Sequence, residues 1–321
     1  MTGIAPTATG GCAVSGTPAA RSPLGWLLAP APAARLAMLR VLVGGYTAVW
    51  AAVRLPAHVG HTDQPAGRWQ PVGVLAPLGS PPPDALVVAV AAVAPVLGLL
   101  FVLGWRYRLI GPAVATVMLG LATLDSSWGQ VFHTENLMVL HLVILALAPG
   151  AADALVAGRR RGRTPTPVPA PDPRYGWPVR LAELAVVLTY LVTGVAKLRV
   201  GGLDWVDGDT LRHLVAHDNL RKALLGDSYS PIGPALIDHA WLFAPLAALT
   251  LMVELGAWVA LLGGRWRTAW VAAAWIFHVG VLAVMAVVFA YPLTGVAFAP
   301  FFRTERLAAR VRRGRAARVH G

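Results

Sequence analysis

Residues 179–198 read VRLAELAVVLTYLVTGVAKL, a mostly apolar run. The run is long enough to cross a bilayer as one helix, which takes about 20 residues. At about 100° per residue, Glu183, Tyr190, Gly194 and Lys197 fall on one face of that helix. A carboxylate, a phenol and an amine therefore share one stripe at membrane depth, where ionisable groups are costly and indicate function by default.

Lysine is rare in this chain. Lys and Arg together number 27, and only Lys197 and Lys222 are lysines. Arginine keeps its proton in proteins, whereas a desolvated lysine can lose its proton and act as a base. The alternative is that Lys197, at a helix end, extends its amine to the membrane interface. Both interpretations stay open at this point.

The composition indicates an integral membrane protein. The 321 residues are 56% hydrophobic and 13% charged, against about 25% charged in a soluble domain, and mean hydropathy is +0.61. The apolar runs are rich in Ala, Leu and Val and do not alternate with polar residues, so helices are the only plausible spanning structure. We predict an all-α integral membrane protein, a multi-span helical bundle in the lipid bilayer.

The net charge of +12 does not indicate nucleic-acid binding. The arginines cluster at the ends of apolar runs and on one predicted side, as the positive-inside rule requires. The Arg-rich tail is predicted to bind anionic lipid headgroups. With Cys12 as its single cysteine, the chain has no internal disulfide.

The apolar runs predict about eight transmembrane helices in the cell membrane, with both termini cytoplasmic. Residues 268–302 count as two short spans that meet around residues 285–288, because a single span would place the Arg-rich tail outside. The other six predicted spans are Leu36–Pro56, Ala85–Gly104, Leu109–Leu124, Asn136–Pro149, Val179–Leu198 and His239–Leu262.

Composition also divides the chain. Residues 1–34 are predicted to be a disordered cytoplasmic leader, because they are rich in Ala, Pro, Gly and Thr without periodicity. The transmembrane domain covers residues 35–302, as halves 35–150 and 178–302 joined by the Arg/Pro-rich linker 151–177. Residues 303–321 form the Arg-rich cytoplasmic tail. Between the fifth and sixth spans, Asp209–Leu225 is predicted to be an interfacial helix capped by Asp207 or Asp209.

Further polar side chains lie in or at the edge of predicted spans. They are His133 with Asn136 and His141, then Glu254 and His278. Buried charges need partners, so we expect Glu183 or Glu254 to pair with Lys197 or an arginine. A lone histidine on an apolar face usually satisfies a neighbour, and we expect this of His141.

Two histidine groups have spacings that suit a metal ion. One is His58-x2-His61-x-Asp63 and the other is His213-x3-His217-Asp218. Such spacings are common by chance in exposed helices, so we predict no metal site.

The stretch around Lys197 resembles the HTTM (horizontally transferred transmembrane) domain family, which includes vitamin K-dependent gamma-carboxylase. The similarity lies in Tyr190-Leu-Val-Thr-Gly-Val-Ala-Lys197-Leu198 and in Trp205-Val-Asp-Gly208, where the family has a lysine before Leu and a downstream Trp-x-x-Gly. Three shorter pieces also resemble the family. They are Arg40 in Leu39-Arg40-Val41, His133 ahead of the helix that ends Leu147-Ala-Pro149, and Phe277-His278. The resemblance runs over about residues 35–302.

The resemblance implies a chemistry. In the carboxylase, a neutral lysine deprotonates a reduced naphthoquinone, oxygen converts the anion into a strong alkoxide base, and that base removes a proton from a glutamate γ-carbon to which carbon dioxide adds. Carried over, Lys197 is the base and His133 the partner that stabilises charge. The expected pocket residues are Arg40, Asn136, Glu183, Tyr190, Trp205, Glu254 and His278. The expected substrate or cofactor is a reduced naphthoquinone of the menaquinone or vitamin K type.

The chain also departs from the carboxylase. Position 196 is Ala where the carboxylase has a second lysine, and the carboxylase continues into a large extra-membrane domain that grips its peptide substrate. Two alternatives to an enzyme remain open: a quinone- or lipid-binding protein that serves a membrane redox partner without catalysis, and a proton-coupled transporter that uses the two glutamates and the histidines.

Overall fold

A computed structural model of the chain describes residues 22–153 and 170–307. Within these ranges the protein is all-helical and has no strand, only an isolated β-bridge between Ala31 and Asp172. The α-helices are α1 (Pro23–Leu27), α2 (Ala33–Val59), α3 (Asp84–Leu103), α4 (Tyr107–Asp125), α5 (Asn136–Ala146), α7 (Pro173–Val206), α8 (Asp209–Leu224), α9 (Ile232–Ile237), α10 (Phe243–Leu255), α11 (Gly264–Met285) and α12 (Ala290–Leu293). Short 3-10 helices are η2 (Gly60–Asp63), η3 (Ala66–Arg68), η4 (Gly73–Leu75), η5 (Pro149–Ala152), η6 (Ala240–Leu242), η7 (Ala257–Leu262) and η8 (Val296–Phe301).

Five helices in the described ranges are long and apolar enough to cross a membrane. They are Ala33–Asp63 (α2 with η2), α3, α4, α7 and α11. Two shorter apolar helices, Asn136–Ala146 and Ala240–Leu255, fall on the predicted fourth and sixth spans. The structure thus has fewer full-length spanning helices than the eight expected from the sequence, because the remaining apolar runs are divided into short α- and 3-10 pieces.

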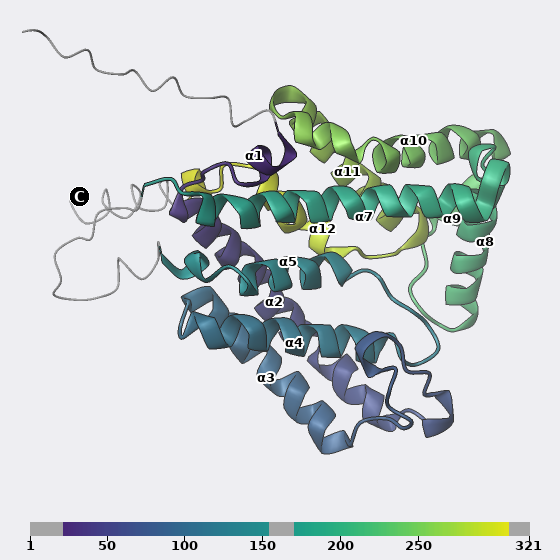
Figure 1. The fold of residues 1–321 in the computed structure, drawn as a ribbon. Coiled ribbons are helices and arrows are strands. Elements are labelled where there is room, and N and C mark those ends of the chain that lie inside the picture. Colours follow the sequence, from purple (N-terminus) through teal and green to yellow (C-terminus); the bar gives the residue numbers. More distant parts are fainter. Residues whose placement is uncertain (1–21, 154–169, 308–321) are drawn as a thin grey trace, which may run out of the picture.

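Helix α7 connects the two halves of the bundle. In Figure 1, α2, α3 and α4 form the lower part, α10 and α11 the upper part, and α5 lies between α4 and α7. Small residues let the helices approach closely, as is usual in membranes, where packing rather than water exclusion holds helices together. A Cβ at Gly98 of α3 would lie 2.8 Å from Ala48 Cα of α2. A Cβ at Gly194 of α7 would lie 2.9 Å from Leu255 Cδ2 of α10.

Helix α7 continues beyond its predicted end. The sequence predicts a span that ends at Leu198, followed by a loop, but the helix runs to Val206. The chain absorbs the change of direction at Gly202, whose φ of 55° and ψ of −135° are not helical. Glycine has no Cβ and adopts such a conformation at little steric cost. This kink lies between Lys197 and Trp205.

The region 268–302 divides where the sequence predicts. Helix α11 ends at Met285, and Ala286 takes a left-handed conformation with φ 51°. The chain then continues as α12 and η8, which are short. The predicted break around residues 285–288 is therefore confirmed, while the second piece is not a regular spanning helix.

The two predicted boundaries next to α7 and α2 need correction. Residues 22–34 belong to the ordered fold, because α1 packs on α7 and Ala31 bridges to Asp172. Helix α7 begins at Pro173, inside the predicted linker 151–177. Residues 1–21, 154–169 and 308–321, which include most of the linker and tail, lie outside the described residues.

One end of the molecule gathers basic residues and both described ends of the chain. Arg35 at the start of α2 donates two hydrogen bonds to Glu305, at 2.9 and 2.7 Å. Arg267 at the start of α11 donates to Phe301 O at 2.9 Å. Burial raises the pKa of Glu305, but the hydrogen bonds from Arg35 outweigh this and hold its pKa below the usual value. We call this region, with the α3–α4 turn and the start of α7, the basic end.

Candidate functional site

Lys197 of α7 forms an ion pair with Glu254 of α10. The Nζ–Oε1 distance is 2.7 Å, and the side chains are 18% and 2% exposed. A buried charge without a partner is strongly destabilising, so each of these groups requires the other. The sequence predicts this pair as one of several possibilities, and the structure selects it.

Two aromatic rings face the Lys197 amine. Its Nζ lies 4.8 Å from the ring centroid of Trp205 and 5.5 Å from that of Phe277. A cation over an aromatic face is attracted by the negative face of the ring. Trp205 follows the kink at Gly202. The kink changes the direction of the last turn of α7, which carries Trp205.

A second polar pair lies on the same face of α7. The hydroxyl group of Tyr190 and Nε2 of His278, on α11, are 2.7 Å apart. The Tyr190 ring packs edge-on against Trp270, with centroids 5.1 Å apart. The polar stripe of α7 therefore faces α10 and α11, as the helical spacing of Tyr190 and Lys197 requires.

His133 approaches this group from the loop before α5. Its ring lies 5.4 Å from the ring of Phe289, which in turn lies 5.0 Å from the ring of His278. Phe289 lies in the break between α11 and α12. His133 is exposed, so it lies at the rim of the group, and the ring of Phe289 packs near both histidine rings.

Three buried polar atoms around the lysine have no hydrogen-bond partner in the described part of the chain. They are Glu254 Oε2, His278 Nδ1 and Trp205 Nε1. Buried polar groups in native proteins are nearly always paired, and exceptions call for an explanation such as catalysis, a ligand or water. An acceptor, a ring nitrogen and an indole donor are thus free to bind a polar group from outside the chain. We call Lys197, Glu254, Trp205, Tyr190 and His278 the lysine site.

An apolar cavity of about 370 Å³ lies beside the lysine site, between α8, α10 and α11. Phe277 lines the cavity and also faces the Lys197 amine. The rest of the lining is nearly all aliphatic or aromatic, including Val215, Phe243 and Val281. A mostly apolar cavity with a few polar groups at one side is the usual form of a small-molecule site.

Three of the predicted pocket residues lie elsewhere. Glu183 accepts from Arg180 at 3.0 Å at both carboxylate oxygens, and 14 residues separate it from Lys197, roughly 21 Å along a helix. Arg40 is fully buried and donates to Phe101 O at 2.7 Å. Asn136 is exposed at the start of α5. The structure therefore places Lys197, Tyr190, Trp205, Glu254 and His278 together, with His133 at their rim.

His141 has the interhelical role expected for it. Its Nδ1 lies 2.7 Å from the hydroxyl group of Tyr291 on α12, and its Nε2 lies 3.3 Å from Ala182 O on α7. The residue is fully buried. It joins three helices by hydrogen bonds, which is a frequent use of histidine between membrane helices.

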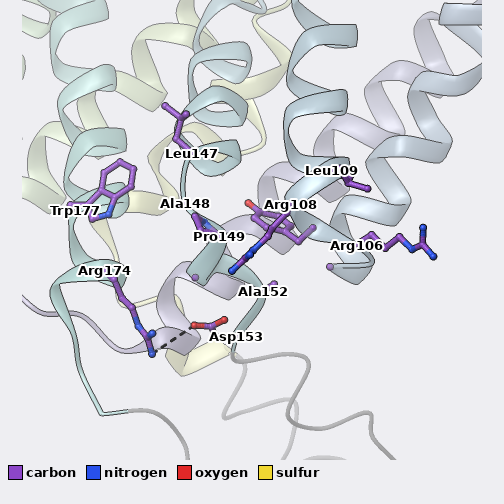
Figure 2. Close-up of a pocket in the computed structure, with 13 residues that line it drawn as sticks. Arg106, Arg108, Leu109, Leu147, Ala148, Pro149, Ala152, Asp153, Arg174 and Trp177 are labelled. Atoms are coloured by element: carbon purple, nitrogen blue, oxygen red, sulfur yellow. Dashed lines mark ion pairs between the residues drawn. The ribbon is translucent and has the colours of Figure 1, made fainter.

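The basic end holds a second, polar cavity of about 770 Å³. Arg106, Arg108 and Arg174 line it, and Figure 2 shows Arg174 directed at Asp153, with which it forms an ion pair at 3.8 Å. The Arg40 guanidinium lies behind this cavity, 5.6 Å from the ring of Tyr107. The cavity concentrates positive charge at the end of the molecule where the sequence predicts the cytoplasmic surface.

Phe277 and Phe289 are not among the site residues predicted from the sequence, although Phe277 belongs to the Phe277-His278 piece of the family resemblance. Both are apolar residues in an apolar region, so their type carries no signal. The only available signal is position, because Phe277 precedes His278 and Phe289 follows the predicted break. Their contacts depend on how α11 turns back on α7, which is a property of the tertiary fold.

No known protein family, no curated protein and no solved structure matches this chain.

Proposed function

We propose that this chain is an HTTM-type membrane enzyme that acts on a lipid-soluble hydroquinone, with Lys197 as the base. In this proposal the reduced naphthoquinone enters the apolar cavity between α8, α10 and α11 and brings its polar ring to the lysine site. The reaction is carboxylase-like: the hydroquinone is oxidised and a strong base is generated for a carbon acid.

One observation carries the proposal. A partly buried lysine and a buried glutamate lie next to Phe277, which lines an apolar cavity, and Glu254 Oε2, His278 Nδ1 and Trp205 Nε1 lack partners in the described residues. A purely structural ion pair needs no unpaired donors and acceptors around it, since such atoms destabilise the fold. A ligand with an apolar body and hydroxyl groups at one end complements both parts.

The ion pair can supply a base. In this proposal the proton of the hydrogen bond from Lys197 Nζ to Glu254 Oε1 is transferred between two forms of the pair: the first is ammonium with carboxylate, and the second is amine with carboxylic acid. In the second form the amine has a free lone pair and can accept the O–H proton of the hydroquinone, at hydrogen-bonding distance. The hydroquinone anion balances the charge of the ammonium group that forms, and Glu254 keeps its proton.

The redox balance follows from the substrates. The hydroquinone and O₂ give the quinone epoxide and water: one oxygen atom enters the ring, and the other leaves with the two hydroquinone hydrogens. The alkoxide formed on the way removes a proton from a carbon acid, and CO₂ adds to the carbanion. His133, at the open rim beside Phe289, would stabilise negative charge on these intermediates.

Epoxide formation tests the proposal. Membranes that contain the protein are supplied with reduced menaquinone or vitamin K, and the epoxide is measured by mass spectrometry. We expect epoxide from the wild type and none from Lys197→Ala or Lys197→Arg, because arginine keeps the charge opposite Glu254 but cannot act as a base. Lys222→Arg is the matched control. Lys222 is the only other lysine and pairs with Asp218 on α8 at 2.8 Å.

A second variant addresses the cavity. Gly280 lines it, and a Cβ at this position meets nothing within 4 Å. Gly280→Phe should narrow the cavity, raise the KM for the hydroquinone and leave folding intact. Epoxide formation by Lys197→Arg at the wild-type rate, or the absence of epoxide in the wild type, would refute the enzymatic proposal.

A non-catalytic binding protein is the second candidate. It is favoured by the same ion pair, because Glu254 already neutralises Lys197 without any substrate. Such a protein would bind the quinone and present it to a membrane redox partner. Saturable quinone binding without epoxide, retained in Lys197→Arg and reduced in Gly280→Phe, would support this candidate over the enzyme.

The proposed topology has about eight spans in the cell membrane and both termini in the cytoplasm. In addition to the five long helices, α5, the segment η6–α10–η7 and the segment α12–η8 would complete the crossings. The support is the gathering of Arg35, Arg180, Arg267 and Glu305 at the basic end. The arginine-lined cavity there and the Arg-rich tail would contact anionic headgroups.

A further inference from the structure

Three ligand-type side chains meet at the opposite end of the bundle from the basic end. His58 lies in the last turn of α2, His61 in η2 and Asp125 at the last position of α4. Asp125 Oδ1 lies 3.0 Å from His58 Nδ1 and 2.7 Å from His61 Nε2. One ligand atom from each residue falls within 4.8 Å of the other two. This group is separate from the lysine site, which α7, α10 and α11 form.

The group is buried and its carboxylate is oriented. His58 is 0% and Asp125 6% exposed, while the His61 side chain is 17% exposed. Arg54 Nη2 donates to the other carboxylate oxygen, Oδ2, at 3.3 Å. This contact occupies Oδ2 and leaves Oδ1 directed at the two histidines. A hydrogen bond from a neighbouring side chain to a ligating carboxylate commonly fixes its orientation toward a metal ion.

Hydrogen bonds within the described residues do not account for every polar atom here. His58 Nε2, Arg54 Nε and Trp128 Nε1 are buried without partners in the described ranges. Trp128 stacks on His61, with ring centroids 5.8 Å apart and planes 10° apart. His61 and Trp128 also line a cavity of about 310 Å³. The group thus has an open side, through which a small ion and its water can enter.

We propose that His58, His61 and Asp125 bind a divalent transition-metal ion, with Zn²⁺ as the ion whose preferences they fit best. Two imidazole nitrogens and one carboxylate oxygen are typical zinc ligands, and sites with three protein ligands keep a fourth position for water. The hard ions Ca²⁺ and Mg²⁺ prefer oxygen ligands and fit this donor set less well. The fourth position would face the cavity beside His61 and Trp128.

The geometry is close to that of a metal site. Zinc–ligand bonds of about 2.0–2.2 Å in a tetrahedron put the ligand atoms roughly 3.4 Å apart. The observed 3.0 and 2.7 Å are hydrogen-bond lengths, so the ion requires Asp125 Oδ1 to retreat by several tenths of an ångström. The two histidine nitrogens, which lie within 4.8 Å of each other, have to take up the same tetrahedral spacing. Each histidine would carry its remaining proton on the other ring nitrogen. These are side-chain adjustments, and the helices need not move.

This inference revises the prediction from the sequence. That prediction grouped the histidines with Asp63 and rejected a metal, because short-range spacing alone is weak. The third ligand is instead Asp125, 64 residues after His61. The convergence of separate helix ends in a buried position carries more weight than local spacing.

Metal analysis of the purified protein tests the proposal. The protein is purified in detergent without a polyhistidine tag, treated with EDTA, incubated with excess ZnCl₂, desalted and analysed for zinc. We expect one zinc ion per chain in the wild type and a loss of nearly all of it in His61→Ala and in Asp125→Asn. The double variant His213→Ala/His217→Ala is the matched control and should keep its zinc, because both histidines are exposed on α8.

Two further measurements separate a metal defect from a folding defect. Circular dichroism should give the same helix content for Asp125→Asn and the wild type. Reconstitution with Co²⁺ should give visible ligand-field bands in the wild type only. Equal zinc in the wild type and both site variants, or loss of zinc only in the His213/His217 variant, would overturn the proposal. The proposal would also be overturned if the wild type retains no zinc and its melting temperature is unchanged by added Zn²⁺. The three residues would then be a metal-free hydrogen-bonded cluster.

Discussion

At the residue scale, the ion pair between Lys197 and Glu254 governs the energetics of the lysine site. Glu254 is almost completely buried, and among the described residues Lys197 is the only cation that forms an ion pair with it. Taking two charges out of water is unfavourable, and their mutual attraction offsets the cost only while both are present. The stability of the helix contact between α7 and α10 therefore depends on the pair rather than on either residue alone.

A double-mutant cycle should reveal this dependence. Lys197→Leu leaves a buried carboxylate without a partner and should lower the free energy of unfolding by about 3–5 kcal/mol. Lys197→Leu combined with Glu254→Leu should recover most of that loss, because no unpaired charge remains. Unfolding in detergent, followed by circular dichroism, measures both. The expectation would be contradicted if the double variant loses as much free energy of unfolding as Lys197→Leu and Glu254→Leu lose together.

The sequence predicts which polar residues matter better than it predicts which of them are in contact. It identifies Lys197, Glu254, Tyr190 and His278 because ionisable side chains are rare in apolar runs. It expects Glu183 or Glu254 to pair with Lys197 or an arginine, but it does not predict the contact between Tyr190 and His278. It misplaces Glu183, which shares the helical face of Lys197 but lies more than three turns away, beside Arg180. Helical periodicity gives the direction of a side chain but not which neighbouring helix reaches it at each depth.

At the scale of the helices, small residues set the distance between α2 and α3. Gly98 lies against the backbone of Ala48, and a Cβ there would approach Ala48 N, Cα and Cβ to within 3.0 Å. Because a backbone cannot move aside as a flexible side chain can, an added methyl group must push the helices apart.

Gly98→Ala should destabilise the protein by about 1–3 kcal/mol, the usual effect of overpacking. Gly45→Ala is the control, since Gly45 lies on α2 and a Cβ there meets nothing within 4 Å. The control should lose no stability, because alanine has the higher helix propensity. Thermal unfolding in detergent compares the two. A Gly98→Ala variant as stable as Gly45→Ala would show that α2 and α3 can separate without loss.

The positions of helices are predictable here, but their ends are less so. The α3–α4 turn at residues 104–106 overlaps the turn expected at residues 105–108, and the break after Met285 lies where the charge pattern predicts it. The end of α7 does not, because Gly201 and Gly202 suggest a loop and the structure uses only Gly202 as a kink within a longer helix. A glycine permits a bend without requiring one, and the packing of Trp205 at the lysine site decides the outcome.

At the scale of the whole molecule, charge is distributed unevenly between the two ends. Arginines and both described chain ends gather at one end, and the His58, His61 and Asp125 group lies at the other. Our proposed topology places the basic end in the cytoplasm, following the positive-inside rule.

Labelling of single cysteines should reveal this orientation. In a Cys12→Ala background, Arg306→Cys should react with a membrane-impermeant thiol reagent only after the membrane is opened. Gln64→Cys, which follows η2 at the other end, should react in intact cells. The opposite pattern would invert the assignment, and reaction of both cysteines in intact cells would exclude an even number of crossings.

The ion pair between Arg35 and Glu305 can form only late in the synthesis of the protein. The two residues are 270 positions apart, so Arg35 leaves the ribosome long before its partner exists. At about 5–20 residues per second, the delay is roughly 15–50 s. During that time the first helix is held by its contacts with elements made earlier than Glu305, chiefly α3 and also α5, η5 and α7. The start of α2, which is synthesised early, therefore gains its ion pair with Glu305 only near the end of synthesis.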